Sequence, residues 1–411
     1  MTPEIRRVRE DELAAYVDAM STAFLERPDA DKVAEELKPL WDRDRTWAAL
    51  DGDRICGTFR SWATELTVPG GGVLPAGAVS GVTVLPSHRR RGILRAMVAA
   101  EHGAMRDRGE AIGLLYASEY PIYGRFGYGP AIRSATAVVD ARSTSLPGPT
   151  PAHVLVERPD ESLTTPLREV GEAWRLRQPG EIRRRDYRLE YDLGLRESAW
   201  DGRWKGILAV HRDQAAGSID GYVRYRPIQK WEFGQPRGSL EVDDLYALTD
   251  EAYAALWQYL LESDWVATIR VERQSLSNRL PWLLTNARAL RYEDVGDGMW
   301  VRLLDVRRAL EGRTYEREDR LVLEVRDAEV VNGRLRLELD AGPDGARCRP
   351  SDRTPDLALD VGALGAAYLG GRSLRDAVLA YGGADEQRAG ALAAADALFR
   401  TLDEPRCSTF F

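Results

Sequence analysis

Cysteine and histidine are both scarce in this chain. Its 411 residues include only three cysteines and four histidines, at Cys56, Cys348, Cys407, His88, His102, His153 and His211. The cysteines lie far apart and form no CxxC pair, so the pattern disfavours a disulfide framework or a zinc site and favours a reducing compartment. No histidine pair has metal-ligand spacing, so we expect a mechanism without metal.

Long apolar runs are also missing. No stretch approaches the roughly 18–20 apolar residues that a membrane-spanning helix requires. The first residues, MTPEIRRVREDELAAYVDAM, carry acids and bases from the start and contain no apolar signal-peptide core. We therefore expect a cytoplasmic protein with no membrane partner.

Neither sign of charge dominates the sequence. There are 57 lysines and arginines against 65 aspartates and glutamates, which gives a formal net charge of −8. A balance of this kind weakly disfavours nucleic acid as a partner and is mildly compatible with small cationic substrates.

The order of predicted elements divides the chain into three units, which we place at residues 1–148, 149–296 and 297–411. In the first unit, the strand AVSGVTVLP, the helix RGILRAMVAAEHGAMRDRG and the strand EAIGLLYAS follow one another. This is the β-α-β order of an α/β domain. The segment from Ser143 to Ala152 is rich in serine, proline and glycine, which is typical of a linker.

The second unit has a similar but less regular order of predicted strands and helices. A helix (LREVGEAWRLR) and a predicted hairpin precede the strand RGSLEVDDLYALT, the helix EAYAALWQYLLES and the strand WVATIRVERQ. In the third unit, two alternating strands surround Asn332-Gly333, and alanine-rich segments from LALDVGALGAAYLGG onward are predicted to be helical. Strands followed by helices indicate a small α+β domain.

The stretch from Val79 to Met97, VSGVTVLPSHRRRGILRAM, carries the clearest chemical signal. A strand ends at Pro86, three arginines follow, and Gly92 stands where a helix begins. Such a turn presents unpaired backbone N–H groups at the positive end of the helix dipole, which suits a pyrophosphate. The alternative is a solvated charge run, but three cations at a helix N-terminus oppose the dipole unless an anion is bound.

The spacing Arg89-x-x-Gly92-x-Leu94 resembles the pyrophosphate signature of the GCN5-related N-acetyltransferases, which bind acetyl-CoA. Leu94 departs from the small residue usual at the last position. In that superfamily the preceding strand, here Val82 to Pro86, bulges and its amides pair with the pantetheine arm, and one N–H can polarise the thioester carbonyl.

A second stretch, YASEYPIYGRFGYGP from Tyr116 to Pro130, places Tyr123 and Tyr128 around a Gly-Arg-Phe-Gly turn. Taken alone, tyrosines near glycines are ordinary core or turn residues. Together with SHRRRGILRAM, however, the segment resembles the enhanced intracellular survival (Eis) acetyltransferases of actinobacteria. MWVRLLDVRRALEGRTY, GARCRPSD and LGAAYLGG resemble the third domain of that family.

The resemblance implies α/β and α+β architecture. The expected order is an acetyltransferase domain, a second degenerate acetyltransferase domain, and a domain similar to sterol carrier proteins. The family is typically hexameric and acetylates amines, including several amines of one aminoglycoside, with acetyl-CoA as co-substrate. Residues 243–253 of the second unit contain no RRRG-type loop, so we expect no CoA binding there.

The resemblance also assigns site residues. Tyr123 falls on the general acid of the family, and its general base is the carboxylate of a C-terminal phenylalanine, here Phe411. The positions expected to contact acetyl-CoA are Val82, Thr83, Val84, Arg89, Arg90, Arg91, Gly92, Ile93, Leu94, Arg95, Ser118 and Glu119.

The chemistry is consistent with these roles. The attacking amine must lose a proton, and the departing thiolate benefits from a proton donor. A carboxylate with a reference pKa of about 3.5 is a weak base unless it is buried, or unless it acts through water and by attracting the ammonium. No cysteine lies near the motif in the sequence, which favours direct transfer over a covalent acetyl-enzyme.

Residues expected on the substrate side are Phe24, Glu26 and Trp41. Phe24 and Glu26 lie near a family position that carries an acid, and Trp41 could supply an aromatic wall; the alternative is a helix end with a surface glutamate. Some family members also have an acid before the terminal phenylalanine, where this chain has Phe410. Its absence removes a negative charge from the expected pocket for cationic aminoglycosides.

Two other functions compete with an enzyme. One is a non-catalytic carrier of lipid or acyl-CoA that uses the third domain, although ordinary core packing explains the same alanine-rich helices. The other is an acyl-CoA sensor without turnover, which would have no need of both Tyr123 and an aromatic C-terminus.

Overall fold

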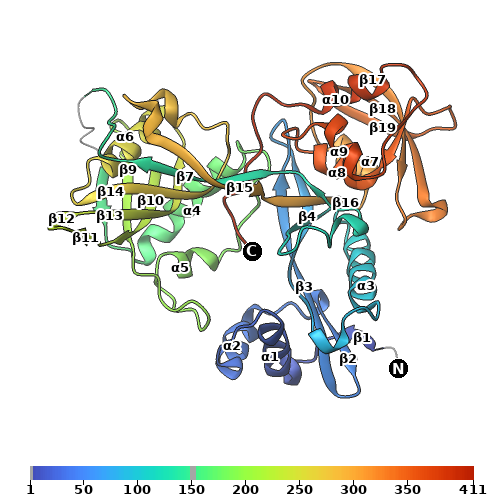
Figure 1. Cartoon of the computed structure of the whole chain (residues 1–411), viewed down its shortest axis with the longest axis horizontal. Helices are drawn as coiled ribbons and strands as arrows, with labels where there is room; N and C mark the ends of the chain where they lie inside the picture. The colour runs from blue at the N-terminus through green and yellow to red at the C-terminus, as the bar shows by residue number, and fades with distance from the viewer. Residues whose placement is uncertain (1–2, 149–153) are drawn as a thin grey trace.

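The computed structural model describes residues 3–148 and 154–411. Part of the predicted linker, residues 149–152, and the start of the predicted second domain lie outside the described residues. Figure 1 shows three lobes, with the last residue of the chain near the centre, where they meet.

The first lobe contains a seven-stranded sheet in the order β1-β2-β3-β4-β5-β16-β6. Only the β4–β5 pair is parallel; the other neighbours run antiparallel. Helices α1 and α2 lie on one side of the strands and α3 on the other (Figure 1). The elements are β1 (Glu4–Arg7), α1 (Leu13–Ala23), α2 (Ala30–Leu37), β2 (Thr46–Asp51), β3 (Arg54–Thr67), β4 (Val73–Val84), α3 (Ile93–Asp107), β5 (Ile112–Tyr116), β6 (Gly129–Pro130) and β16 (Met299–Leu303).

The second lobe repeats this plan in the order β15-β7-β14-β13-β10-β9-β8, again with one parallel pair, β13–β14. A two-stranded ribbon, β11–β12, projects from it. The elements are β7 (Arg133–Asp140), β8 (Val154–Glu157), α4 (Glu161–Arg175), α5 (Arg188–Asp192), β9 (Ile207–Arg212), β10 (Ile219–Ile228), β11 (Trp231–Glu232), β12 (Gln235–Pro236), β13 (Gly238–Ala247), α6 (Asp250–Leu261), β14 (Val266–Gln274) and β15 (Leu290–Asp297).

The third lobe is a five-stranded sheet in the order β19-β18-β17-β20-β21, with helices packed against it. The segment Leu357–Asp360, which we expected to begin a helix, is a strand instead, because it pairs in parallel with β17. The elements are α7 (Val306–Glu311), β17 (Asp319–Arg326), β18 (Arg334–Gly342), β19 (Gly345–Pro350), β20 (Leu357–Asp360), α8 (Val361–Ala367), α9 (Leu374–Ala380), β21 (Asp385–Glu386) and α10 (Ala391–Phe399).

Local sequence explains several element boundaries. The β2–β3 hairpin turns at Asp51-Gly52, where Gly52 has a φ of 61°, a conformation that costs glycine little. Helix α6 begins after Thr249, whose side chain accepts a hydrogen bond from the N–H of Ala252. Asp160 caps α4 in the same way through the N–H of Ser162.

The two large sheets exchange strands. β7 follows the first lobe in the chain but pairs with β14 and β15 in the second sheet. In return β16, which lies inside our predicted third domain, pairs with β5 and β6 of the first sheet. The predicted divisions at 148/149 and 296/297 therefore do not coincide with the sheets, because β7 lies before the first division and β16 after the second.

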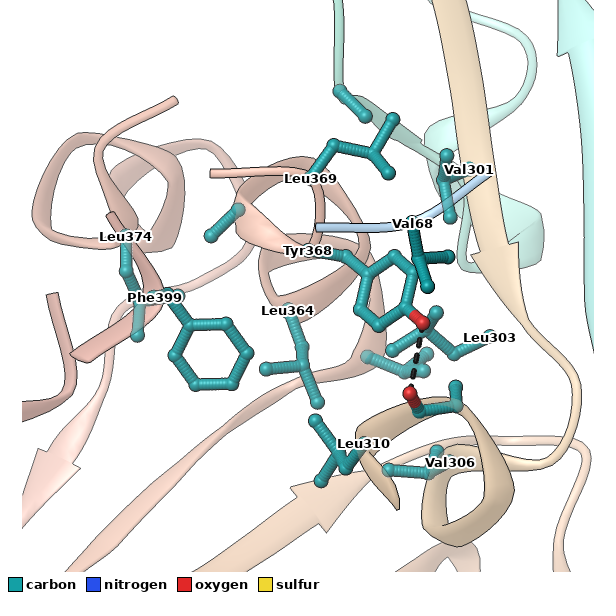
Figure 2. Packing of buried hydrophobic residues seen from close by; sticks show 14 of the residues in the cluster. Val68, Val301, Leu303, Val306, Leu310, Leu364, Tyr368, Leu369, Leu374 and Phe399 are labelled. Atoms are coloured by element: carbon teal, nitrogen blue, oxygen red, sulfur yellow. Dashed lines mark hydrogen bonds between the residues drawn. The ribbon is translucent and has the colours of Figure 1, made fainter. Parts of the chain in front are cut away.

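The core of the third lobe is continuous with β16. Val301 and Leu303 of β16 pack against Leu364 and Leu369, which lie in and just after α8 (Figure 2). The Tyr368 hydroxyl is also buried there and donates a hydrogen bond of 2.8 Å to the carbonyl of Ala309. The first and third lobes therefore share one hydrophobic interior.

A buried ionic network joins the same two lobes. Arg302 on β16 is fully buried and contacts both carboxylate oxygens of Asp327 at 2.8 Å and the Glu329 carboxylate at 3.2 Å. His102 and Arg106 of α3 also hydrogen-bond to Glu329. Burial opposes ionisation of Glu329, but these hydrogen bonds and the Arg302 charge prevail and lower its pKa to about 2.

Replacing Arg302 tests this network. Arg302→Ala leaves two carboxylates without their buried counter-charge, and we expect the free energy of unfolding to fall by about 3–5 kcal/mol. Urea denaturation measures the change, and Arg317→Ala at an exposed position provides a control that should shift by less than about 0.5 kcal/mol. Equal stability of the two variants would contradict a structural role for the network.

Candidate active site

A fork opens in the first sheet between β4 and β5. The two strands pair in parallel from Ala76 with Ile112 to Ala78 with Leu114. β4 then continues to Val84, while β5 ends at Tyr116 and stays paired with β16 on its other edge. Within the described chain, the edge of β4 from Val79 to Val84 that faces β5 has no strand partner. Apart from the carbonyls of Gly81 and Val84, which accept hydrogen bonds from the side chains of Thr58 and Arg89, its backbone donors and acceptors are available to a bound molecule.

A bulge lies in the unpaired part of β4. Arg60 is opposite Ser80 and Thr58 is opposite Thr83, so β4 has one extra residue here. Gly81 has a φ of 59°, and a Cβ at this position would lie 2.9 Å from the Met20 sulfur. The Thr83 side chain is buried against the Thr58 hydroxyl, at 2.6 Å, so we expect only the backbone of Thr83 to reach a ligand.

The arginine loop leads from β4 to α3. Arg90 and Gly92 have φ values of 64° and 78°. The first backbone hydrogen bond of α3 runs from the N–H of Ala96 to the carbonyl of Gly92. Helix geometry therefore leaves the N–H groups of Ile93, Leu94 and Arg95 without intrahelical acceptors. Among the described residues, apart from the chain neighbours of Gly92, no atom lies within 4 Å of the position that a Cβ on Gly92 would occupy. The cradle formed by the N–H groups of Ile93, Leu94 and Arg95 is therefore open.

The side chains of this loop divide into two groups. Arg89 donates to the Val84 carbonyl at 3.5 Å, and Arg91 lies 3.6 Å from the Asp51 carboxylate. Arg90 and Arg95 are exposed and have no hydrogen bond or ion pair with any described residue. Two free guanidinium groups beside unpaired amides fit a pyrophosphate.

The neighbouring predicted positions differ in exposure. The Ile93 side chain is buried in the core and Leu94 is half-buried, so both face the protein rather than solvent. Ser118 and Glu119 are exposed just after β5. The structure thus gathers the predicted acetyl-CoA positions around the fork.

Tyr123 is buried on the α3 face of the sheet. It belongs to the same apolar cluster as Leu115 and Met97, and its ring lies 6.0 Å from that of Tyr128. Its hydroxyl makes no hydrogen bond to another described residue. Burial, together with the nearby Glu119 carboxylate, raises the pKa of Tyr123 to about 12, so the phenol stays protonated near neutral pH.

Cys56 lies in the same cluster, although sequence distance had separated it from the motif. Burial and the Asp51 carboxylate raise the pKa of its thiol. Since the thiolate is the reactive form, Cys56 is a poor nucleophile.

Phe411 packs on the opposite face of the sheet. Its ring lies 4.9 Å from the ring of Trp62 on β3 and 5.1 Å from that of Tyr116 on β5. Trp62 is paired with Ala78, which is also the last β4 residue paired with β5. The end of the chain therefore lies where the fork opens, with Tyr123 on the other side of it.

Glu181 holds the chain segment that leads to Phe411. Its carboxylate is buried and accepts hydrogen bonds from the N–H and hydroxyl of Ser408, both at 2.7 Å, and from the N–H of Thr409 at 3.3 Å. Tyr116 donates to the Thr409 carbonyl at 2.9 Å. The tail is thus fixed to β5 of the first sheet and to the segment that carries Glu181.

The tail also occupies a second fork. β13 is bulged near Asp243, and its parallel pairing with β14 ends at Val242 and Val271. Beyond that point, Tyr246 of β13 and Arg273 of β14 both hydrogen-bond to Ser408. The second sheet therefore has the geometry of the first, with the protein's own tail contacting both arms.

The three predicted substrate-side residues differ in exposure. Phe24 and Glu26 are exposed at and after the end of α1, whereas Trp41 is half-buried in the cluster that includes Ala199 of the second lobe. The indole N–H of Trp41 is buried without a hydrogen-bond partner among the described residues.

Sequence reasoning overlooked four residues of this region: Arg60, Trp62, Glu181 and Arg185. The alternation Arg60-Ser61-Trp62 on a strand could have indicated that both large side chains share a face. Glu181 and Arg185 lie in GEIRRRDY, which has no periodic pattern, so no sequence signal distinguished them.

Comparison with known proteins agrees with this geometry. Residues 4–131 and 180–303 each match an acetyltransferase (GNAT) domain, and residues 306–408 match a sterol carrier protein domain. The second match shows that residues 180–303 retain the acetyltransferase fold.

Relatives extend along the whole chain. An uncharacterized N-acetyltransferase of Streptomyces griseus is 41% identical over 423 residues, covering 100% of both chains. N-acetyltransferase Eis of Mycobacterium tuberculosis is 35% identical over 328 residues, covering 78% of this chain and 77% of its own.

Solved structures give the same result. Eis1 from Mycobacterium abscessus superposes with a TM-score of 0.84 at 33% identity, covering 99% of this chain and 100% of that one. A GCN5-related N-acetyltransferase from Kribbella flavida, at 21% identity and a TM-score of 0.77, shares the fold. With its paired forks, exchanged strands and sterol-carrier-like lobe, the chain belongs to the Eis family of GCN5-related N-acetyltransferases and is an N-acetyltransferase.

Proposed function

We propose that the enzyme transfers the acetyl group of acetyl-CoA directly to an amine of a small molecule. Tyr123 acts as the general acid and the terminal carboxylate of Phe411 as the general base. The observation that carries the proposal is the β4–β5 fork, which has a buried, protonated phenol on one face and the last residue of the chain on the other.

Acetyl-CoA supplies an activated thioester, and the chain supplies the groups around it. The amides of Ile93, Leu94 and Arg95, with the guanidinium groups of Arg90 and Arg95, would hold the pyrophosphate. The unpaired edge of β4 from Val82 to Val84 would hold the pantetheine arm, and a bulge N–H would polarise the carbonyl.

In this proposal, Tyr123 and the terminal carboxylate of Phe411 carry out the proton transfers. The Phe411 carboxylate attracts the ammonium form of the acceptor and accepts its proton, directly or through water. The Tyr123 hydroxyl donates to the thiolate that forms as the thioester breaks. A phenol with a pKa of about 12 is a weak acid, so it releases its proton only when negative charge develops on sulfur.

The acceptor in this proposal is a small amine. The resemblance implies polyamine-type acceptors such as aminoglycosides, acetylated at one or several positions. Assembly as a hexamer and a cytoplasmic location stay predictions. No helix in residues 3–148 and 154–411 has both the length and the apolar character needed to cross a membrane.

An acetyl-transfer assay tests the proposal. The purified enzyme is incubated with acetyl-CoA and a panel of aminoglycosides, polyamines, amino acids and lysine peptides, and CoA release and product mass are recorded. Tyr123→Phe should lower kcat by about 10²–10⁴-fold and leave the Kd for acetyl-CoA unchanged, because only the proton donor is lost.

The matched control for this variant is Tyr120→Phe, which removes an exposed hydroxyl three residues away. Because the pKa of Tyr123 is raised to about 12, kcat of the wild-type enzyme should not fall between pH 7 and pH 10 through loss of this proton. Undiminished turnover by Tyr123→Phe would refute its role as the acid.

The role of Phe411 can be tested by moving its carboxylate. One alanine added after Phe411 displaces the terminal carboxylate by about 3.5 Å and should lower kcat by at least about 100-fold. The control carries the same alanine near the N-terminus. If both proteins are equally active, the terminal carboxylate is not the base.

Glu181 should act as a positioning residue for the tail. Glu181→Gln replaces an acceptor-only group with an amide, so the Ser408 and Thr409 N–H groups lose part of their hydrogen bonding. We expect faster amide hydrogen exchange in the tail and a fall in kcat of about 10–100-fold, with unchanged acetyl-CoA affinity. Glu169→Gln, exposed on α4, should change none of these quantities; a Glu181→Gln enzyme with normal kcat would exclude the positioning role.

A further inference from the structure

The face of the first sheet that carries Phe411 also carries an unusual pair of arginines. Side chains alternate along β3, so Phe59 and Ser61 face α3 while Arg60 and Trp62 face the other way. Phe411 packs on Trp62 on this second face. Because Tyr123 occupies the α3 face, we take the second face as the side from which the acceptor enters.

Arg60 lies beside the β4 bulge, and its side chain makes no hydrogen bond or ion pair with another described residue. A Cβ on Gly81 would be 3.5 Å from Cγ and 3.6 Å from Nε of Arg60. The Nε atom is buried and makes no hydrogen bond, and no described carboxylate lies within 4.0 Å of the guanidinium group. The side chain as a whole is half-buried, but a buried N–H donor without an acceptor is costly.

Arg185 of the second lobe reaches the same place. Its guanidinium carbon lies 4.6 Å from the centre of the Trp62 ring, and one N–H donates to the Tyr187 hydroxyl at 2.5 Å. It too has no described carboxylate within 4.0 Å. Burial lowers the pKa of Arg185 and the charge of Arg60 lowers it further, while Tyr187 and the Asp42 carboxylate act in the opposite direction. The two cations are therefore close enough to repel.

Other arginines in the interior of the second lobe are paired. Arg184 contacts the Asp244 carboxylate at 2.6 Å, and Arg224 contacts the same group at 2.6 Å. Arg175 forms an ion pair with Glu65 at 3.1 Å. These three arginines are neutralised by carboxylates, whereas the half-buried Arg60 and Arg185, on the acceptor side of the fork, have no carboxylate within 4.0 Å among the described residues.

We propose that the acceptor amine carries an oxyanion, a carboxylate or a phosphate, which Arg60 and Arg185 bind. This rests on the proposed acetyl transfer and specifies its substrate class. A guanidinium group presents a planar fork of N–H donors that matches a carboxylate or phosphate. One such group on the acceptor would relieve the repulsion between the two arginines while the amine points toward the fork. A polycation such as an aminoglycoside would face two like charges.

Matched amines test the proposal. The series compares 4-aminobutyrate with neutral 4-aminobutanamide and cationic 1,4-diaminobutane, repeated with chains from two to six carbons, and adds phosphoethanolamine to distinguish phosphate from carboxylate. We expect kcat/KM to be highest, by at least about tenfold, for anionic members. A preference of the wild-type enzyme for the diamines would overturn the proposal.

Substitution of the two arginines tests whether they cause the preference for anionic amines. Arg60→Gln and Arg185→Gln should each reduce kcat/KM for the anionic amines by at least about tenfold, through loss of charge-assisted hydrogen bonds, with little effect on the neutral ones. Arg60→Lys, which keeps the charge in case the glutamine variant does not fold, should recover part of the loss. Arg183→Gln is the control, because Arg183 is exposed and paired with Asp186 at 3.5 Å.

Two results distinguish this inference from the proposed function. If both glutamine variants slow all amines equally, the arginines serve Phe411 rather than the substrate, and the inference fails while acetyl transfer stands. If no amine is acetylated, calorimetric titration with the anionic amines decides: binding that Arg60→Gln and Arg185→Gln abolish supports the oxyanion site, and absence of binding by the wild-type protein overturns it.

Discussion

The hydrogen bonds between Glu181 and the tail are the interaction on which the rest of the site depends. A buried carboxylate needs donors, and here most of them come from Ser408 and Thr409. The same residues also bond to Tyr116 of the first sheet and to Tyr246 of the second. One charged group thereby fixes the end of the chain to two sheets, and the Phe411 ring reaches Trp62 as a result.

The second lobe then has a clear structural role. It keeps the bulged strand and the fork of an acetyltransferase fold, but Tyr246 and Arg273 on the arms of that fork contact Ser408. Residues 243–253 contain no arginine loop, so nothing there presents an anion cradle like the one at Gly92. The same architecture is used twice, once around an open cradle and once around a segment of the protein itself.

What the sequence could predict was local. The turn at Gly92, the strand before it and the helix after it are specified by residues that are neighbours in the sequence. Their pattern therefore predicted the acetyltransferase fold and the Eis family, which the comparisons show. The contact between Glu181 and Ser408 joins residues 227 positions apart, and no local pattern encodes it. The strand exchange was equally hidden, because β7 and β16 have the composition of ordinary buried strands. Whether Arg60 has an ion-pair partner depends on which side chains the fold brings around it, and its neighbours in the sequence do not determine this.

That exchange has a consequence for how the gene can be divided. Every strand of the second sheet, from β7 to β15, lies within residues 133–297. The first sheet instead takes β1–β6 from before that segment and β16 from after it. A gene fragment that ends before β16 would leave β5 and β6 without the strand that joins them. The first lobe is therefore complete only when the second lobe is encoded with it.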